Sequence, residues 1–79
     1  MKKAIEKFII QFLLDRFGIE ADSKTRMNCL TDEQLDQLLK GLQEEFKVQL
    51  RLSDILWYIQ VYQLNVEDLS SVTFTKIVG

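Results

Sequence analysis

Very few side chains of the types that perform catalysis occur in this chain. It contains no histidine, which removes the usual general base and the commonest metal ligand, and Cys29 is its one cysteine. A thiolate just before a helix N-terminus is somewhat stabilised, but a lone thiol without a histidine to activate it lacks the second member of a nucleophilic pair. We therefore expect no catalytic residue and no metal site, and we expect Cys29 to be a small buried hydrophobe.

Carboxylates are more frequent, and two pairs of them, Asp32 with Asp36 and Glu44 with Glu45, have the close spacing that an acid/base site needs. Both pairs fall on what should be the solvent side of a helix. An exposed surface provides neither the burial nor the cleft that would make one carboxyl an acid and its neighbour a base. We predict that the protein is not an enzyme and uses no cofactor.

The same region is an acidic surface. Counting Lys and Arg against Asp and Glu, the charge is +2 over residues 1–30, −4 over residues 31–46 and 0 over residues 47–79. Such a face would speed and orient docking to a basic partner surface and would let two copies attract each other; a merely solvated helix face is the alternative. The net charge of −2 argues against nucleic acid as a partner. The acidic residues are Asp32, Glu33, Asp36, Glu44 and Glu45.

Aromatic residues of the types enriched at binding hot spots occur together at Trp57, Tyr58 and Tyr62. Neighbouring aliphatic residues make this segment apolar on most of its helical circumference. One small core can cover only part of such a helix. We expect the remainder to form an exposed apolar patch that is covered in a dimer or by a protein partner.

The composition is that of one soluble globular domain over residues 1–79, with 47% hydrophobic and 28% charged residues. Because a single cysteine cannot form an internal disulfide, a reducing cytoplasm is the expected location. The apolar run after Met1-Lys2-Lys3 imitates a signal peptide, but charged residues interrupt it and no small-residue cleavage site follows. It is also too polar to span a bilayer, so we expect no membrane association.

The elements that must position these residues follow from hydrophobic spacing. Thr31 and Gln34 form a capping box that starts a helix over residues 31–46. Apolar residues recur along it every three or four positions, which predicts one buried face. That face consists of Leu35, Leu38, Leu39, Leu42 and Phe46.

Three further helices and two connections are predicted around the central helix. A helix over residues 3–17 ends at Gly18, a helix over 55–64 starts from Ser53, and a helix from Asn65 runs to residue 72 or 73, although the β-branched C-terminal end suits an extended chain equally well. Met27 and Leu30 should anchor the polar connection 20–30, which could hold a helical turn. Alternation over residues 48–52 suits a short extended segment. The prediction is an all-α bundle of three to four helices.

Four pieces of the chain, in this order, resemble the acyl carrier protein and peptidyl carrier protein family. They are Phe17-Gly18-Ile19, Leu42-Gln43-Glu44-Glu45-Phe46, the run Val48-Gln49-Leu50 leading to Ser53-Asp54-Ile55, and Asn65-Val66-Glu67-Asp68-Leu69. The match spans nearly the whole chain. It implies an acyl-carrier-like helical bundle that docks its enzymes through an acidic second helix, although here the first connection is shorter and the third helix longer than is usual in the family.

The functional serine of that family is missing at the expected place. Its members carry a phosphopantetheine arm on the serine of an Asp-Ser-Leu at the start of the second helix, and counting back from Glu44-Glu45-Phe46 puts Asp32 there. The one Asp-Ser pair, at Asp22-Ser23, lies upstream and precedes lysine. The resemblance therefore implies a non-enzymatic interaction module that docks through the acidic second and aromatic third helices. The alternatives are a working carrier with phosphopantetheine on Ser23 and a structural homodimer.

Overall fold

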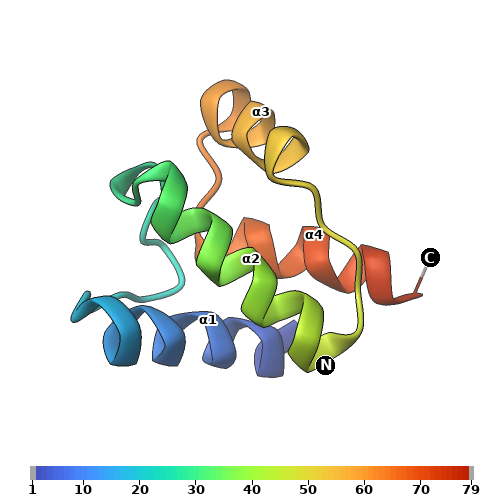
Figure 1. Ribbon diagram of the computed structural model, residues 1–79, viewed down its shortest axis with the longest axis horizontal. Helices are drawn as coiled ribbons and strands as arrows, with labels where there is room; N and C mark the ends of the chain where they lie inside the picture. The colour runs from blue at the N-terminus through green and yellow to red at the C-terminus, as the bar shows by residue number, and fades with distance from the viewer. Residues whose placement is uncertain (1, 79) are drawn as a thin grey trace.

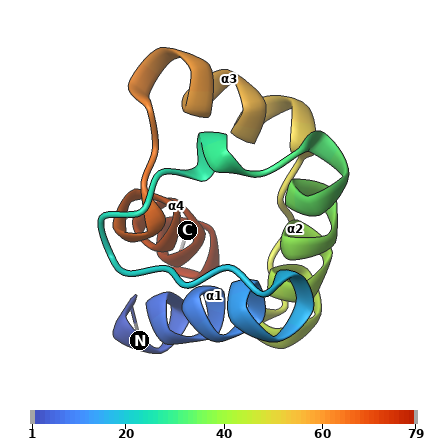
Figure 2. The same ribbon diagram turned by 90° about the vertical axis from the view of Figure 1, so that its left-hand side faces the viewer.

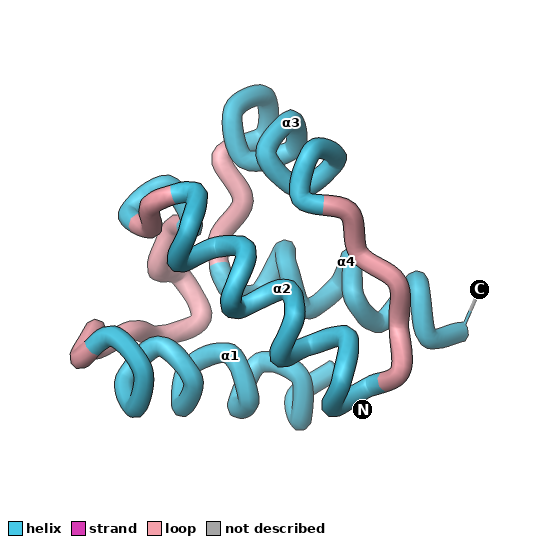
Figure 3. Tube along the Cα trace, viewed as in Figure 1, coloured by secondary structure: helices cyan, strands magenta, loops and turns pink. Residues whose placement is uncertain are grey.

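The computed structural model describes residues 2–78, which form a bundle of four α-helices and one short 3₁₀ turn (Figure 1). Within these residues no strand occurs, and loops make the connections (Figure 3). The predicted all-α bundle is confirmed. In chain order the elements are α1 (Lys2–Phe17), η1 (Met27–Cys29), α2 (Asp32–Phe46), α3 (Leu52–Tyr62) and α4 (Val66–Val78).

Two helices pack against α1. It contacts both α4 and α2, which lie on either side of it, and α3 lies at the opposite end of the molecule, on α2 and η1 (Figure 2). The core fills the space between these elements. Its buried side chains are Ile5, Ile9, Leu13, Met27, Leu35, Leu38, Leu39, Leu42, Val48, Leu50, Ile55, Ile59, Leu64, Val66 and Leu69.

The start of α2 is fixed by the predicted capping box. The backbone N–H of Gln34 donates to the Thr31 hydroxyl oxygen at 3.1 Å, and the Thr31 N–H donates to the Gln34 side-chain oxygen at 3.0 Å. The predicted face is buried except at Phe46, which was expected to be buried and is only partly so. Phe46 comes last in α2, where its ring packs at the bundle edge, 5.6 Å from that of Phe8.

The end of α1 also follows the predicted pattern. Gly18 has a φ of 66°, the left-handed conformation that lacks a steric cost in glycine. Its N–H donates to the Leu14 carbonyl at 3.0 Å, which is the hydrogen bond of the αL C-cap motif, and the Ile19 N–H donates to the Leu13 carbonyl, also at 3.0 Å. Two carbonyls at the end of the helix are thereby satisfied.

The polar connection between α1 and α2 is tied to the start of α4. Met27 is buried and its N–H donates to the Leu64 carbonyl at 2.8 Å, while the Val66 N–H donates to the Thr25 carbonyl at 2.9 Å. The expected helical turn is η1. Met27 is thus an anchor as predicted, and Leu30 is half-buried.

The connection between α2 and α3 departs from the prediction. Val48 and Leu50 are buried, as the alternation suggested, while residues 47–51 form a loop in which the predicted extended segment is not confirmed. The helix α3 begins at Leu52, and the predicted N-cap Ser53 lies inside its first turn, exposed. Packing of Leu52 against the core outweighs the capping preference of serine.

The last helix begins where predicted and continues further. The Asp68 N–H donates to the Asn65 side-chain oxygen at 2.8 Å, and the Asn65 N–H donates to the Asp68 carboxylate at 3.2 Å. α4 then extends to Val78, so the expected end at residue 72 or 73 and the extended alternative are both wrong for these residues. The Thr73 hydroxyl donates to the Leu69 carbonyl at 2.8 Å. Packing of α4 against α1 outweighs the weak helix propensity of the β-branched residues in this segment.

Candidate functional site

Of the five large hydrophobic side chains that are exposed in the described part of the chain, four lie on α3, and we call them the α3 patch: Trp57, Tyr58, Val61 and Tyr62. They are 53%, 37%, 53% and 61% exposed. The ring centroids of Trp57 lie 5.4 Å from Tyr58 and 5.6 Å from Tyr62, and the two tyrosine rings lie 5.9 Å apart. The aromatic residues therefore pack against one another on the surface instead of entering the core.

Helix geometry and the position of α3 explain why these residues are outside. Ile55 and Ile59, four residues apart, form its buried stripe. Trp57 and Val61 share the same spacing on a different face, as do Tyr58 and Tyr62. Because α3 lies at the edge of the bundle, on α2 and η1, its other faces have no neighbouring helix to cover them (Figures 1 and 2). The predicted exposure of apolar surface on this helix is confirmed.

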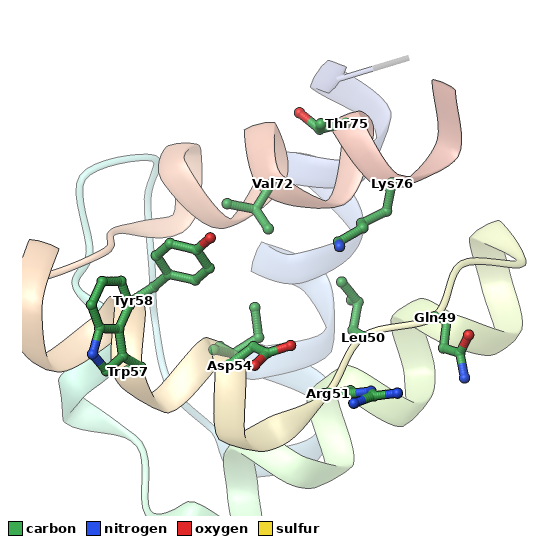
Figure 4. A pocket seen from close by; sticks show the side chains of 10 residues that line it. Gln49, Leu50, Arg51, Asp54, Trp57, Tyr58, Val72, Thr75 and Lys76 are labelled. Carbon is green, nitrogen blue, oxygen red and sulfur yellow. The ribbon is translucent and has the colours of Figure 1, made fainter. Parts of the chain in front are cut away.

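A groove adjoins the α3 patch. It lies between α3, the preceding loop and the C-terminal half of α4, has a volume of about 710 Å³, and is partly open to solvent (Figure 4). Trp57 and Tyr58 form part of its wall, and Lys76 reaches into it from α4. Sequence reasoning missed this groove, because no local pattern links residues of α3 and α4. The lining residues are Gln49, Leu50, Arg51, Asp54, Ile55, Trp57, Tyr58, Val72, Thr75 and Lys76.

The acidic residues of α2 do not converge on one site. Asp32 and Glu33 are exposed in its first turn, whereas Glu44 and Glu45 are exposed in its last turn, about 18 Å away at 1.5 Å per residue. Asp36 lies between them and pairs with Lys40 at 3.0 Å on the surface. An exposed pair of this kind contributes little stability. These carboxylates form a charged helix face and do not line the groove beside the α3 patch.

Cys29 is exposed, which contradicts the prediction that it is buried. The 3₁₀ turn η1 directs Met27 into the core, and with three residues per turn the side chain two positions later faces away from it. Sequence spacing alone gave no indication of this turn's orientation. Within residues 2–78 no three His, Cys, Asp or Glu side chains are placed to hold a metal ion.

Ser23 and Asp32 occupy different structural settings. Ser23 lies in a turn of the connection, where its carbonyl accepts a hydrogen bond from the Glu67 N–H at 3.0 Å. The adjacent Asp22 carboxylate accepts from the Lys24 N–H at 2.9 Å. Asp32 is the first residue of α2. Ser23 is thus half-buried, in a turn and not at a helix N-terminus.

In the part of the chain from residue 2 to residue 78, no helix combines the length and apolarity that crossing a membrane requires. Comparison of the chain with protein families, with curated proteins and with solved structures found no match.

Proposed function

We propose that this chain is a non-enzymatic protein-interaction module that docks through the α3 patch. The observation that carries the proposal is the exposure of Trp57, Tyr58, Val61 and Tyr62 on one small helix. Contiguous exposed apolar surface on a small soluble domain marks a contact site, and tryptophan and tyrosine are the residue types that contribute most to binding energy there. Covering these rings in a complex would remove apolar area from water.

The acidic face of α2 has a supporting role in this proposal. α2 contacts α3, so a partner seated on the α3 patch would come near a helix of charge −4 over residues 31–46. Charge of this kind speeds encounter and orients the partner more than it adds affinity. The favoured partner therefore has a basic surface beside an apolar contact, and self-association through the uneven charge of the chain is the alternative.

The relationship to carrier proteins is a further part of the proposal. Four helices in sequence, with an acidic second helix that begins at Asp32, support a degenerate acyl-carrier-like protein that lacks the attachment serine. On this view the protein has kept a docking role and lost the arm. A carboxylate at the first position of α2 gains about 0.3–1 kcal/mol from the helix dipole, so replacing a serine there preserves the helix start.

Site-specific photo-crosslinking in the cell of origin tests the docking proposal. Replacing Tyr62 with benzoylphenylalanine puts the crosslinker within the α3 patch, and replacing the exposed Glu20 puts it in the connection after α1. We expect a discrete protein adduct from position 62, reduced when Val61→Ser is added, and none from position 20. Equal adducts from both positions, or no adduct from position 62, would contradict the proposal.

A charge variant tests the role assigned to α2. Combining Glu33→Gln with Glu45→Gln removes two exposed carboxylates and leaves the buried face intact. We expect slower adduct formation at low salt and little difference at high salt, because the ions of the buffer screen exposed charges. An unchanged rate of adduct formation at low salt would mean that these two carboxylates face solvent without helping the partner to dock.

A further inference from the structure

We propose that the groove between α3 and α4 binds a small amphipathic monocarboxylate, a single anionic head group joined to an apolar, aromatic body. This goes beyond protein docking, because it assigns the groove a ligand of its own. The groove and the α3 patch share Trp57 and Tyr58, but Val61 and Tyr62 do not line the groove. The two functions can therefore be separated by mutation.

The apolar part of the groove matches the body of such a ligand. Leu50 and Ile55 are buried and contribute the apolar surface beneath it, and Val72 adds to this from α4 (Figure 4). Trp57 and Tyr58 offer aromatic surface at one side. A volume of about 710 Å³ lies within the range that small-molecule sites occupy. Aromatic rings stack on aromatic walls with an attraction beyond the area they bury.

The charged residues of the groove favour one negative charge. Arg51, from the loop before α3, and Lys76, from α4, bring two cations to its lining, and Asp54 brings one carboxylate. Neither cation makes a salt bridge to another residue within 2–78, where the one ion pair joins Asp36 and Lys40. A guanidinium presents two parallel donors that fit a carboxylate, and an ammonium adds a third. The net charge of +1 suits a monoanion better than a dianion.

The chain contains its own reporter for this site. Trp57 is its one tryptophan and lines the groove, so a ligand that enters changes the surroundings of the only indole. The probes are phenylbutyrate, phenylbutanol and phenylbutylamine, which share a body and differ in the charge of the head. We expect saturable change in Trp57 emission with phenylbutyrate and binding weaker by about tenfold or more for the other two, as loss of a charged hydrogen bond implies.

Matched variants test the assignment of the cations. Lys76→Gln and Arg51→Gln should each weaken phenylbutyrate binding by several-fold to about tenfold, whereas Lys24→Gln, which removes an exposed lysine outside the groove, should leave it unchanged. All three side chains are exposed, so the variants should unfold at the parent temperature. Val61→Ser, which alters the α3 patch outside the groove, should also leave phenylbutyrate binding unchanged while it weakens docking.

Three outcomes would overturn the proposal. These are no saturable change with phenylbutyrate, equal binding of the three probes, and equal weakening by Lys24→Gln and Lys76→Gln. If no adduct forms at position 62 but phenylbutyrate binds as expected, only the docking function is contradicted. The two proposals therefore fail separately.

Discussion

The leucines of this protein differ sharply in what they contribute, and the difference follows from their surroundings. Leu38 of α2 is fully buried, whereas Leu14 of α1 is 44% exposed. Leu38→Ala should lower the free energy of unfolding by about 2–5 kcal/mol, because it removes apolar contacts and leaves a cavity. Leu14→Ala should cost less than about 1 kcal/mol, since surface substitutions cost little. Urea unfolding measures both, and equal losses would mean that the buried face of α2 is assigned wrongly.

Ser23 and Asp32 together predict that the protein is not phosphopantetheinylated. Asp32 has no hydroxyl, and Ser23 lies in a turn instead of at a helix N-terminus, where backbone N–H groups favour a phosphodiester. Incubation with coenzyme A and a broad-specificity phosphopantetheinyl transferase should leave the intact mass unchanged, while a known carrier in the same reaction gains one arm. A mass gain that disappears in Ser23→Ala would make the protein a working carrier.

Single residues also show where sequence reasoning fails. The capping box of Thr31 was predictable because both partners lie within four residues of each other. The exposure of Cys29 was not, because it depends on which way η1 turns when Met27 enters the core. That orientation is set by contacts with distant segments, such as the hydrogen bond from Met27 to Leu64.

At the scale of helices, the contact between α1 and α2 depends on the missing side chain of Gly41. A Cβ added there would lie 2.9 Å from Cε2 of Phe12, whose ring is flanked by those of Phe8 and Phe17 at 5.8 Å each. Alanine would gain up to about 1 kcal/mol in helix propensity, but overpacking costs about 1–3 kcal/mol. Gly41→Ala should therefore fail to stabilise the protein.

A double-mutant cycle separates the gain in helix propensity from the cost of overpacking against Phe12. In a Phe12→Leu background the smaller side chain leaves room for the new methyl group, so Gly41→Ala should there recover most of the propensity gain in thermal unfolding. An equal stabilisation by Gly41→Ala in both backgrounds would show that the ring of Phe12 moves aside freely. The close approach of α1 to α2 would then not depend on glycine.

The helices also differ in how far their bounds follow from sequence. α2 has a capping box and a clear apolar stripe, so local signals agree and its limits were predicted. The start of α3 was placed late, because Ser53 suits an N-cap but the core packing of Leu52 moves the N-cap two residues earlier, to Arg51. The end of α4 was placed early, because β-branched residues disfavour helix locally while packing on α1 favours it.

At the scale of the whole molecule, the α3 patch was predictable and the groove beside it was not. Too many apolar residues for one buried stripe is a local property of residues 52–62, readable without a structure. The groove is lined by both Arg51 and Lys76, which are far apart in the sequence and come to one site only in the folded arrangement of α3 and α4. The position of α3 at the edge of the bundle gives both features their access to solvent (Figure 2).

This edge position predicts that the patch can be altered without loss of the fold. Tyr62→Ser removes a side chain that is 61% exposed, so the free energy of unfolding should change by less than about 0.5 kcal/mol. Ile59→Ser is the matched control on the same helix. It should destabilise the protein strongly, because it buries a hydroxyl in an apolar environment and leaves a cavity. Equal destabilisation by both variants in urea unfolding would mean that Tyr62 is part of the core.

Docking through the α3 patch can be tested by the accessibility of Trp57 to a neutral quencher, since this single indole belongs to the patch. Acrylamide quenching is measured on the purified protein at concentrations where sedimentation gives a monomer, and again with the protein captured by crosslinking at position 62. We expect ready quenching in the monomer and marked protection in the complex. Docking through the α3 patch would be contradicted if Trp57 is already protected in the monomer, or if its quenching is the same in the monomer and in the crosslinked complex.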